Sequence, residues 1–104
     1  MKKVINVKVT LTTCITMIDD GAYNPRTISD ILQWALLQEK ANDYEVEEIN
    51  DRYLDVKTTT YTMKTEAIIY DQLLDNATRY LLPMTEYICR LLEYYYPLYR
   101  KEQM

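Results

Sequence analysis

An apolar stripe in the last third of this 104-residue chain is the feature that most limits how the chain can fold. From Ala67, alternating steps of three and four residues meet only apolar or aromatic side chains as far as Leu98. Side chains at this spacing lie on the same side of a helix, so the stripe predicts one long amphipathic helix within residues 64–104 that packs against a partner. The stripe consists of Ala67, Tyr70, Leu74, Ala77, Leu81, Met84, Ile88, Leu91, Tyr95 and Leu98.

Pro83 lies inside the predicted helix. A proline in a helix interior removes one backbone hydrogen bond and clashes with the preceding turn, which costs about 3 kcal/mol. The stripe nevertheless keeps its phase across Pro83, and no Gly or Asn stands close to it to form a turn. We therefore expect one kinked helix, or two nearly collinear helices, rather than a hairpin.

The N-terminal part of the chain predicts a strand followed by a short helix. Residues 4–18 alternate between apolar or β-branched side chains at odd positions and mostly polar ones at even positions, which is the pattern of a half-buried strand. After a turn at residues 19–21, we expect a helix from about Thr27 to Ala41, opened by a capping box at residues 27–30. Apolar residues cover more than half of its circumference. It is therefore either enclosed between the sheet and the C-terminal helix, or Trp34 belongs to an exposed contact site.

Two further strands are predicted over residues 44–49 and 53–63, joined by a turn at Asn50 and Asp51. The resulting fold class is α+β, with a three-stranded antiparallel sheet, one short helix and one long, Pro-kinked C-terminal helix. The length fits a single domain, with a strand-helix-hairpin body at residues 1–63 and the long helix at residues 64–104.

The composition argues against most kinds of catalytic site, because the chain has no His, one Gly and two Cys. The missing His excludes the commonest general base, the serine and cysteine triads and most zinc sites. One Gly is too few for a glycine-rich phosphate loop, and Cys14 and Cys89 form no CxxC pair. We expect no enzymatic activity, no cofactor and no metal. The sequence shows no export signal and no apolar run long enough for a bilayer, so we expect a reduced, cytoplasmic protein without membrane contact.

Negative charge is concentrated in one segment. Between Glu39 and Asp55 there are seven acids and two bases, a net of five negative charges, whereas the rest of the chain carries one net positive charge. Such a segment either attracts a basic protein partner or is a solvated hairpin whose charges prevent aggregation. The predicted partner-binding patch consists of Asp43, Glu45, Glu47, Glu48, Asp51 and Asp55.

Tyrosine is unusually frequent, with eleven Tyr, one Trp and no Phe. Tyr80, Tyr87 and Tyr94 follow one another at intervals of seven along the apolar stripe. They either widen a buried stripe or form a protein interface. Because a helix of about 50 Å is longer than the body of a domain with a radius of gyration of roughly 13 Å, we predict a homodimer through this helix. The predicted oligomer interface consists of Tyr80, Tyr87, Ile88, Leu91, Tyr94, Tyr95 and Leu98.

Three functions are compatible with these patterns. The first is a non-enzymatic protein that blocks a basic, nucleic-acid-handling partner through its acidic patch. In general profile it resembles phage or mobile-element inhibitors of host defence nucleases, such as anti-CRISPR proteins, although no motif ties it to a family. The second is an oligomerising regulator or scaffold that works through the tyrosine-rich helix. The third is a single-stranded nucleic-acid binder, which the net charge of −4 disfavours.

Overall fold

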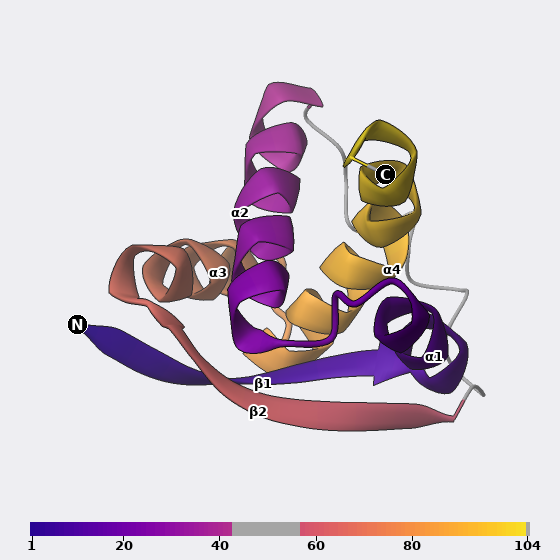
Figure 1. Ribbon diagram of the computed structural model, residues 1–104. Helices are drawn as coiled ribbons and strands as arrows, with labels where there is room; N and C mark the ends of the chain where they lie inside the picture. The colour runs from indigo at the N-terminus through magenta and orange to yellow at the C-terminus, as the bar shows by residue number, and fades with distance from the viewer. Residues whose placement is uncertain (43–56, 104) are drawn as a thin grey trace.

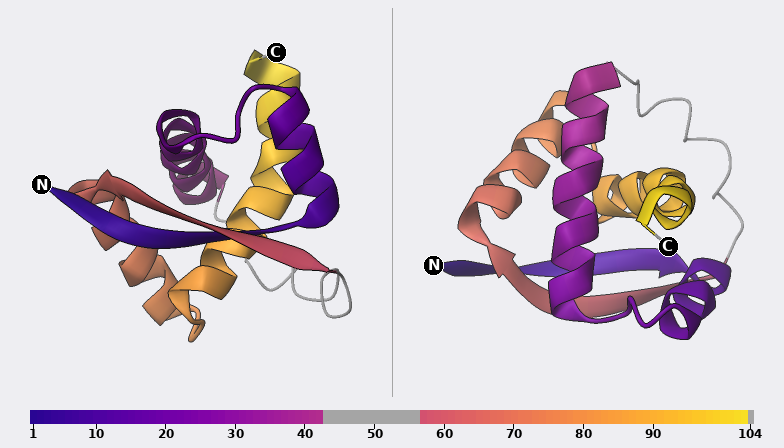
Figure 2. Two further views of the ribbon diagram at one scale, coloured as in Figure 1. Left: turned by 60° about the horizontal axis from the view of Figure 1, so that its bottom comes forward. Right: turned by 45° about the horizontal axis from the view of Figure 1, so that its top comes forward.

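The computed structural model describes residues 1–42 and 57–103 and has an α+β fold. A two-stranded antiparallel sheet forms one layer, and α2, α3 and α4 pack on one side of it (Figure 1). α1 lies at the end of the sheet, beside the C-terminal part of α4 (Figure 2). In chain order the elements are β1 (Lys2–Thr10), α1 (Leu11–Asp19), α2 (Pro25–Asn42), β2 (Thr58–Glu66), α3 (Ala67–Arg79) and α4 (Met84–Gln103).

The sheet has two strands in the described residues, so the three-stranded prediction is wrong for this part of the chain. The strands pair in register from Lys2 opposite Glu66 to Thr10 opposite Thr58. The strand expected at 53–63 is β2, shifted toward the C-terminus, and the one expected at 44–49 lies outside the described residues. The side chains that face the helices are buried: Ile5, Val7, Val9, Met63 and Thr65.

The predicted strand over residues 4–18 ends early, because residues 11–19 form a helix. Thr10 caps that helix: its hydroxyl accepts a hydrogen bond from the Thr13 amide at 3.2 Å. Glu93 of α4 reaches the same junction, where its carboxylate accepts from the Thr10 amide and the Thr13 hydroxyl, both at 2.6 Å. Residues 11–18 thus form a helix despite their alternating pattern, and the contact with Glu93 near the other end of the chain stabilises the start of that helix.

The predicted long C-terminal helix is also wrong, since it is divided into α3 and α4. α3 ends in a Schellman motif, with the Leu82 amide donating to the Ala77 carbonyl at 2.9 Å and the Leu81 amide to the Thr78 carbonyl at 3.1 Å. Leu81 has a φ of 57°, in the left-handed region. Pro83 immediately precedes α4, where its missing N–H removes no helical bond. The two helices diverge from this turn like the arms of a V (Figure 2).

The apolar stripe contributes to the core in the middle of α4, but not at Leu98 near the end of α4 and not throughout α3. In α4 its members Ile88, Leu91 and Tyr95 are fully buried. In α3, however, the buried face is Ile69, Leu73 and Ala77, whereas Leu74 of the stripe is exposed. The continuous phase across Pro83 therefore does not reflect one helix.

α2 begins two residues before its predicted start, because Asn24 rather than Thr27 is its capping side chain. Asn24 Oδ1 accepts a hydrogen bond from the Thr27 amide at 2.9 Å, and Pro25 occupies the first helical position. α2 contacts α3, α4 and β2. Trp34 packs edge-on against Tyr95 and Tyr99 of α4, with ring centroids 6.0 and 5.6 Å apart.

The turn at Leu81 yields a test of stored backbone strain. A non-glycine residue in the left-handed region costs about 1–2 kcal/mol, and glycine's extra backbone entropy offsets about half of that gain. We expect Leu81→Gly to raise the free energy of unfolding by roughly 0.5–1 kcal/mol in urea denaturation. Leu81→Ala is the control, because it removes the same side chain, which is 91% exposed, but keeps the strain. Equal stabilities of the two variants would contradict this account.

The junction between β1 and α1 yields a second test. Glu93→Gln removes the charge and replaces one acceptor oxygen with an NH2 donor, so the Thr10 amide and the Thr13 hydroxyl can no longer both donate to a carboxylate. We expect a loss of about 1–3 kcal/mol in urea denaturation, with faster hydrogen exchange at the Thr13 amide. Glu102→Gln, an exposed change on the same helix, serves as the control and should leave both measurements unchanged.

Candidate functional site

An exposed apolar stripe on α1 is the clearest candidate contact surface among the described residues. Leu11, Ile15 and Ile18 are 42%, 60% and 56% exposed, whereas Met17 on the same helix is fully buried. The three exposed residues are four and three positions apart, so they share one face of the helix. We call them the α1 stripe. Apolar side chains that gather on one exposed face typically mark a site of interaction with another molecule.

Both ends of α1 are fixed to α4, so the stripe is presented in a defined position. At the N-terminal end, Glu93 binds Thr10 and Thr13 as described above. At the C-terminal end, Asp20 accepts a hydrogen bond from the Tyr96 hydroxyl at 2.5 Å. It also forms an ion pair with Arg100 Nε at 2.6 Å. The hydrogen bond from Tyr96 and the positive charge of Arg100 lower the pKa of Asp20.

The predicted acidic patch lies outside the described residues, but its point of attachment does not. Its six acids all fall within residues 43–56, which carry five net negative charges because Arg52 is the one base there. Lys57 follows directly, and its carbonyl accepts a hydrogen bond from the Leu11 amide at 3.1 Å. The acidic segment therefore rejoins the described body at the first residue of the α1 stripe.

The predicted oligomer interface is placed largely in the interior. Four of its seven side chains, Tyr87, Ile88, Leu91 and Tyr95, are fully buried in this chain's own core. The other three keep exposed surface: Tyr80, Tyr94 and Leu98. α3 and α4 are separate helices that fold back within a body of 35 × 33 × 25 Å, so the expectation of one helix longer than the body is wrong. The homodimer itself stays a prediction.

Glu39 of α2 is a second candidate, because it is a buried acid beside a cavity. Its side chain is 3% exposed, and Oε1 is buried without a hydrogen-bond partner. Oε2 accepts a hydrogen bond from the Tyr87 hydroxyl at 3.1 Å, and that hydroxyl accepts from Asn76 Nδ2 at 2.9 Å. A cavity of ≈ 350 Å³ between α2 and α3 adjoins Glu39, Asn76, Arg79 and Tyr80.

Burial raises the pKa of Glu39, while the Tyr80 and Tyr87 hydroxyls and the positive charge of Arg79 act in the opposite direction. A carboxyl with a shifted pKa in a cleft is a recognised sign of function, although structural networks also produce it. Within residues 1–42 and 57–103, no group of three or more Cys, Asp or Glu side chains is placed to hold a metal ion. The tyrosine hydroxyls bound to Glu39 account for the network structurally, so we favour the α1 stripe as the site.

Sequence reasoning missed the α1 stripe because it assigned Leu11 and Ile15 to the buried face of a strand. The helical spacing of Leu11, Ile15 and Ile18 was present in the sequence. It was outweighed by the alternation of residues 4–18, to which β-branched side chains contribute on both faces.

None of the helices in the described ranges has a stretch that is both long and apolar enough to span a membrane. No protein-family model, curated protein or solved structure matches the chain significantly.

The buried Glu39 carboxyl leads to a pH-dependent prediction. Because its pKa in the folded chain is raised above the ordinary value of 4.5, the folded state holds this proton more tightly than the unfolded state. Its contribution to stability is then lost as the pH rises from about 4.5 through the folded-state pKa. Gln cannot lose that proton. The stability of Glu39→Gln relative to wild type should therefore increase with pH above 4.5, as measured by urea denaturation between pH 4 and 8.

Tyr87→Phe is the companion variant, because it removes a hydroxyl that favours the charged form of Glu39. Its stability relative to wild type should fall over the same pH range. A pH-independent difference between wild type and Glu39→Gln would show that the carboxyl does not titrate differently on folding.

Proposed function

We propose that this chain is a non-enzymatic protein-binding protein whose contact surface is centred on the α1 stripe and flanked by the acidic segment 43–56. The observation that carries the proposal is the exposure of Leu11, Ile15 and Ile18 on a helix whose two ends are tied to α4. A helix that is held at both ends loses little backbone freedom on binding, which favours affinity.

The apolar stripe and the acidic segment together support a protein interface. Such an interface has an apolar centre and a polar or charged rim. Here the acidic segment precedes Lys57 in the chain, and the Lys57 carbonyl accepts a hydrogen bond from the Leu11 amide of the stripe. Five net negative charges in that segment would speed the approach of a basic partner and discriminate against acidic ones.

The partner class that fits this surface is a basic protein that handles nucleic acid. Its Lys and Arg side chains ordinarily bind phosphates, and carboxylates compete for the same groups. On this basis we propose an inhibitory role of the kind found in phage or mobile-element antagonists of host defence nucleases. The rival role of a scaffold working through the tyrosine-rich helix draws less support, because most of the side chains it requires are buried in the core.

Two variants test the proposal. Ile15→Asp with Ile18→Asp places charge in the stripe, and Glu45→Lys with Glu47→Lys and Glu48→Lys reverses the acidic segment. Immobilised wild-type chain first captures proteins from a lysate of the source organism. The captured protein is then produced recombinantly, and its affinity for each variant is measured by biolayer interferometry. We expect the stripe variant to lose at least tenfold in affinity, mainly in dissociation rate, and the charge-reversal variant to lose association rate and salt dependence.

Matched controls separate the site from general effects. Leu37→Asp with Ile68→Asp alters two equally exposed apolar side chains elsewhere. Asp71→Lys with Asp75→Lys and Glu102→Lys changes the net charge as much as the acidic-segment variant does. Both controls should bind like wild type, with unchanged circular dichroism. Wild-type affinity in the stripe variant, or equal losses in variant and control, would overturn the proposal.

A further inference from the structure

The net charge of −4 conceals a strongly basic sheet. Residues 1–10 and 57–66, which comprise the two strands and Lys57, carry five lysines and one glutamate, so this region has four net positive charges. The negative charge resides in the acidic segment and on the helices. The lysines are Lys2, Lys3, Lys8, Lys57 and Lys64.

One face of the sheet is open. Register and exposure place Val4 and Asn6 of β1 beside Lys64 and Thr62 of β2 on the face opposite the buried side chains. The Thr62 hydroxyl donates to Asn6 Oδ1 at 2.9 Å, so polar groups are aligned across the two strands. No helix of the described residues crosses this face, as the left-hand view in Figure 2 shows.

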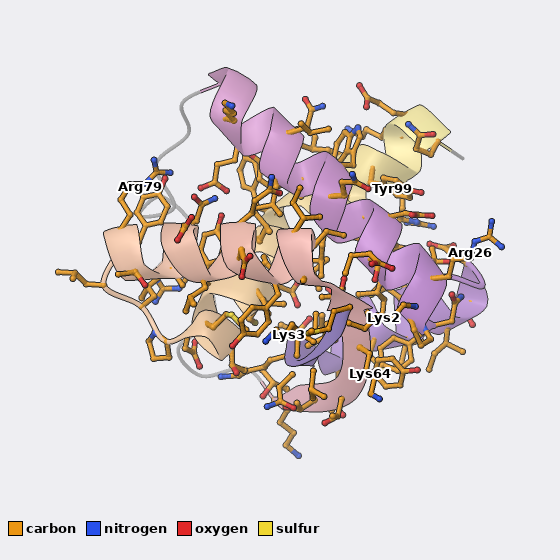
Figure 3. All side chains as sticks on the ribbon, turned by 90° about the vertical axis from the view of Figure 1, so that its left-hand side faces the viewer. Lys2, Lys3, Arg26, Lys64, Arg79 and Tyr99 are labelled. Atoms are coloured by element: carbon orange, nitrogen blue, oxygen red, sulfur yellow. The ribbon has the colours of Figure 1, made fainter. Side chains whose placement is uncertain are left out.

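Cations gather at the end of the sheet that is remote from α1. Figure 3 shows Lys2 and Lys3 of β1 close to Lys64 of β2, with Arg26 of α2 at the edge of the same view. Lys2, Lys64 and Arg26 also adjoin a cavity of ≈ 530 Å³ between the start of α2 and β2, together with Asp30 and Glu66.

The acids near these cations neutralise them only in part. Lys2 Nζ lies 4.0 Å from Glu66 Oε1, and both side chains are largely exposed, so this pair is loose and easily exchanged for another anion. Lys8, by contrast, is engaged with Glu86 of α4. The available positive charge is thus centred on Lys2 and Lys64 of the outer face. Lys3, whose register position is on the helix side, and Arg26 of α2 lie at the same end of the sheet, and we call these four residues the basic end of the sheet.

We infer that the outer face of the β1–β2 ribbon binds the major groove of double-stranded DNA. A two-stranded antiparallel ribbon has the width that this groove admits. The basic end supplies the Lys and Arg contacts with phosphates, while Asn6 and Thr62 offer hydrogen-bonding groups to base edges. This surface is separate from the α1 stripe and extends from the centre of the ribbon to the end remote from α1.

The net charge of −4, taken as an average over the whole chain, disfavours binding to nucleic acid. That objection weakens once the charges are located, because salt screens interactions between exposed charges beyond about 10 Å at 0.1 M ionic strength. The acidic segment rejoins the body at Lys57, which is at the α1 end of the ribbon, whereas Lys2 and Lys64 lie near the opposite end.

The test uses the full chain and a fluorescein-labelled 20-base-pair DNA duplex, with anisotropy measured from 25 to 200 mM salt. We expect binding at low salt whose logarithmic slope against salt is about −0.9 per phosphate contacted. The triple variant Lys2→Gln, Lys3→Gln and Lys64→Gln should bind at least tenfold more weakly at low salt, with a slope shallower by about 2–3. The charge-matched control Lys40→Gln, Arg90→Gln and Lys101→Gln should keep most of the wild-type affinity and slope.

A second pair of variants probes the centre of the ribbon. Asn6→Asp places a carboxylate on the outer face with almost no change in shape, and it should weaken duplex binding several-fold. Gln103→Glu makes the same charge change at the end of α4 and should have little effect.

The inference fails if the wild type does not bind the duplex at 25 mM salt, or if the control triple variant loses as much affinity as the ribbon variant. Binding to a single-stranded DNA of the same length is measured in the same way. Equal or tighter binding to that strand would also overturn the inference, because it would exclude groove recognition as the basis of the affinity.

Discussion

The carboxylate of Glu93 fixes the point at which the first strand becomes a helix. It accepts two hydrogen bonds of 2.6 Å, one from the backbone of Thr10 and one from the hydroxyl of Thr13. A carboxylate at the start of a helix also interacts favourably with the positive end of the helix dipole. Because β1 stops there, residues 11–19 leave the sheet and form α1. The position of the candidate binding surface thus depends on a contact between the first and last elements of the fold.

Two of the three largest buried side chains, Tyr87 and Tyr96, show why tyrosine suits the core of this protein. The Tyr87 hydroxyl lies between Glu39 and Asn76, and the Tyr96 hydroxyl donates to Asp20. Each ring fills the core as phenylalanine would, while its hydroxyl donates a hydrogen bond to a carboxylate. These tyrosines are therefore both packing residues and hydrogen-bond donors.

The surface is divided according to charge and polarity along the sheet. At one end lies the apolar stripe of α1, where the acidic segment rejoins the body. Toward the other end lie Lys2, Lys3, Lys64 and Arg26 (Figure 3). A chain with this division can present one surface to a basic protein and another to a polyanion. Net charge alone hides such an arrangement, because the two contributions nearly cancel.

Local sequence signals determined the elements that depend on local physics. The α+β class, α2 to within two residues at its start, and the alternation of β1 up to Thr10 all follow from side-chain periodicity and turn residues. The concentration of acids in one segment also required only the sequence, and it remains part of the proposed site. The exposed α1 stripe, in contrast, was hidden within a pattern that favoured a strand.

Tertiary structure decided the rest, for two separate reasons. The switch at Thr10 depends on Glu93, 83 positions away in the sequence, and no local pattern can report so distant a partner. The break after α3 depends on Leu81 in a left-handed conformation, which is normally signalled by glycine or asparagine. Because residue 81 is a leucine, the local sequence does not predict the turn. The packing of α3 and α4 around one core holds the turn in place. The sequence by itself therefore determined the periodicities and the charge clusters, and the three-dimensional packing decided where each helix ends and which apolar faces stay exposed.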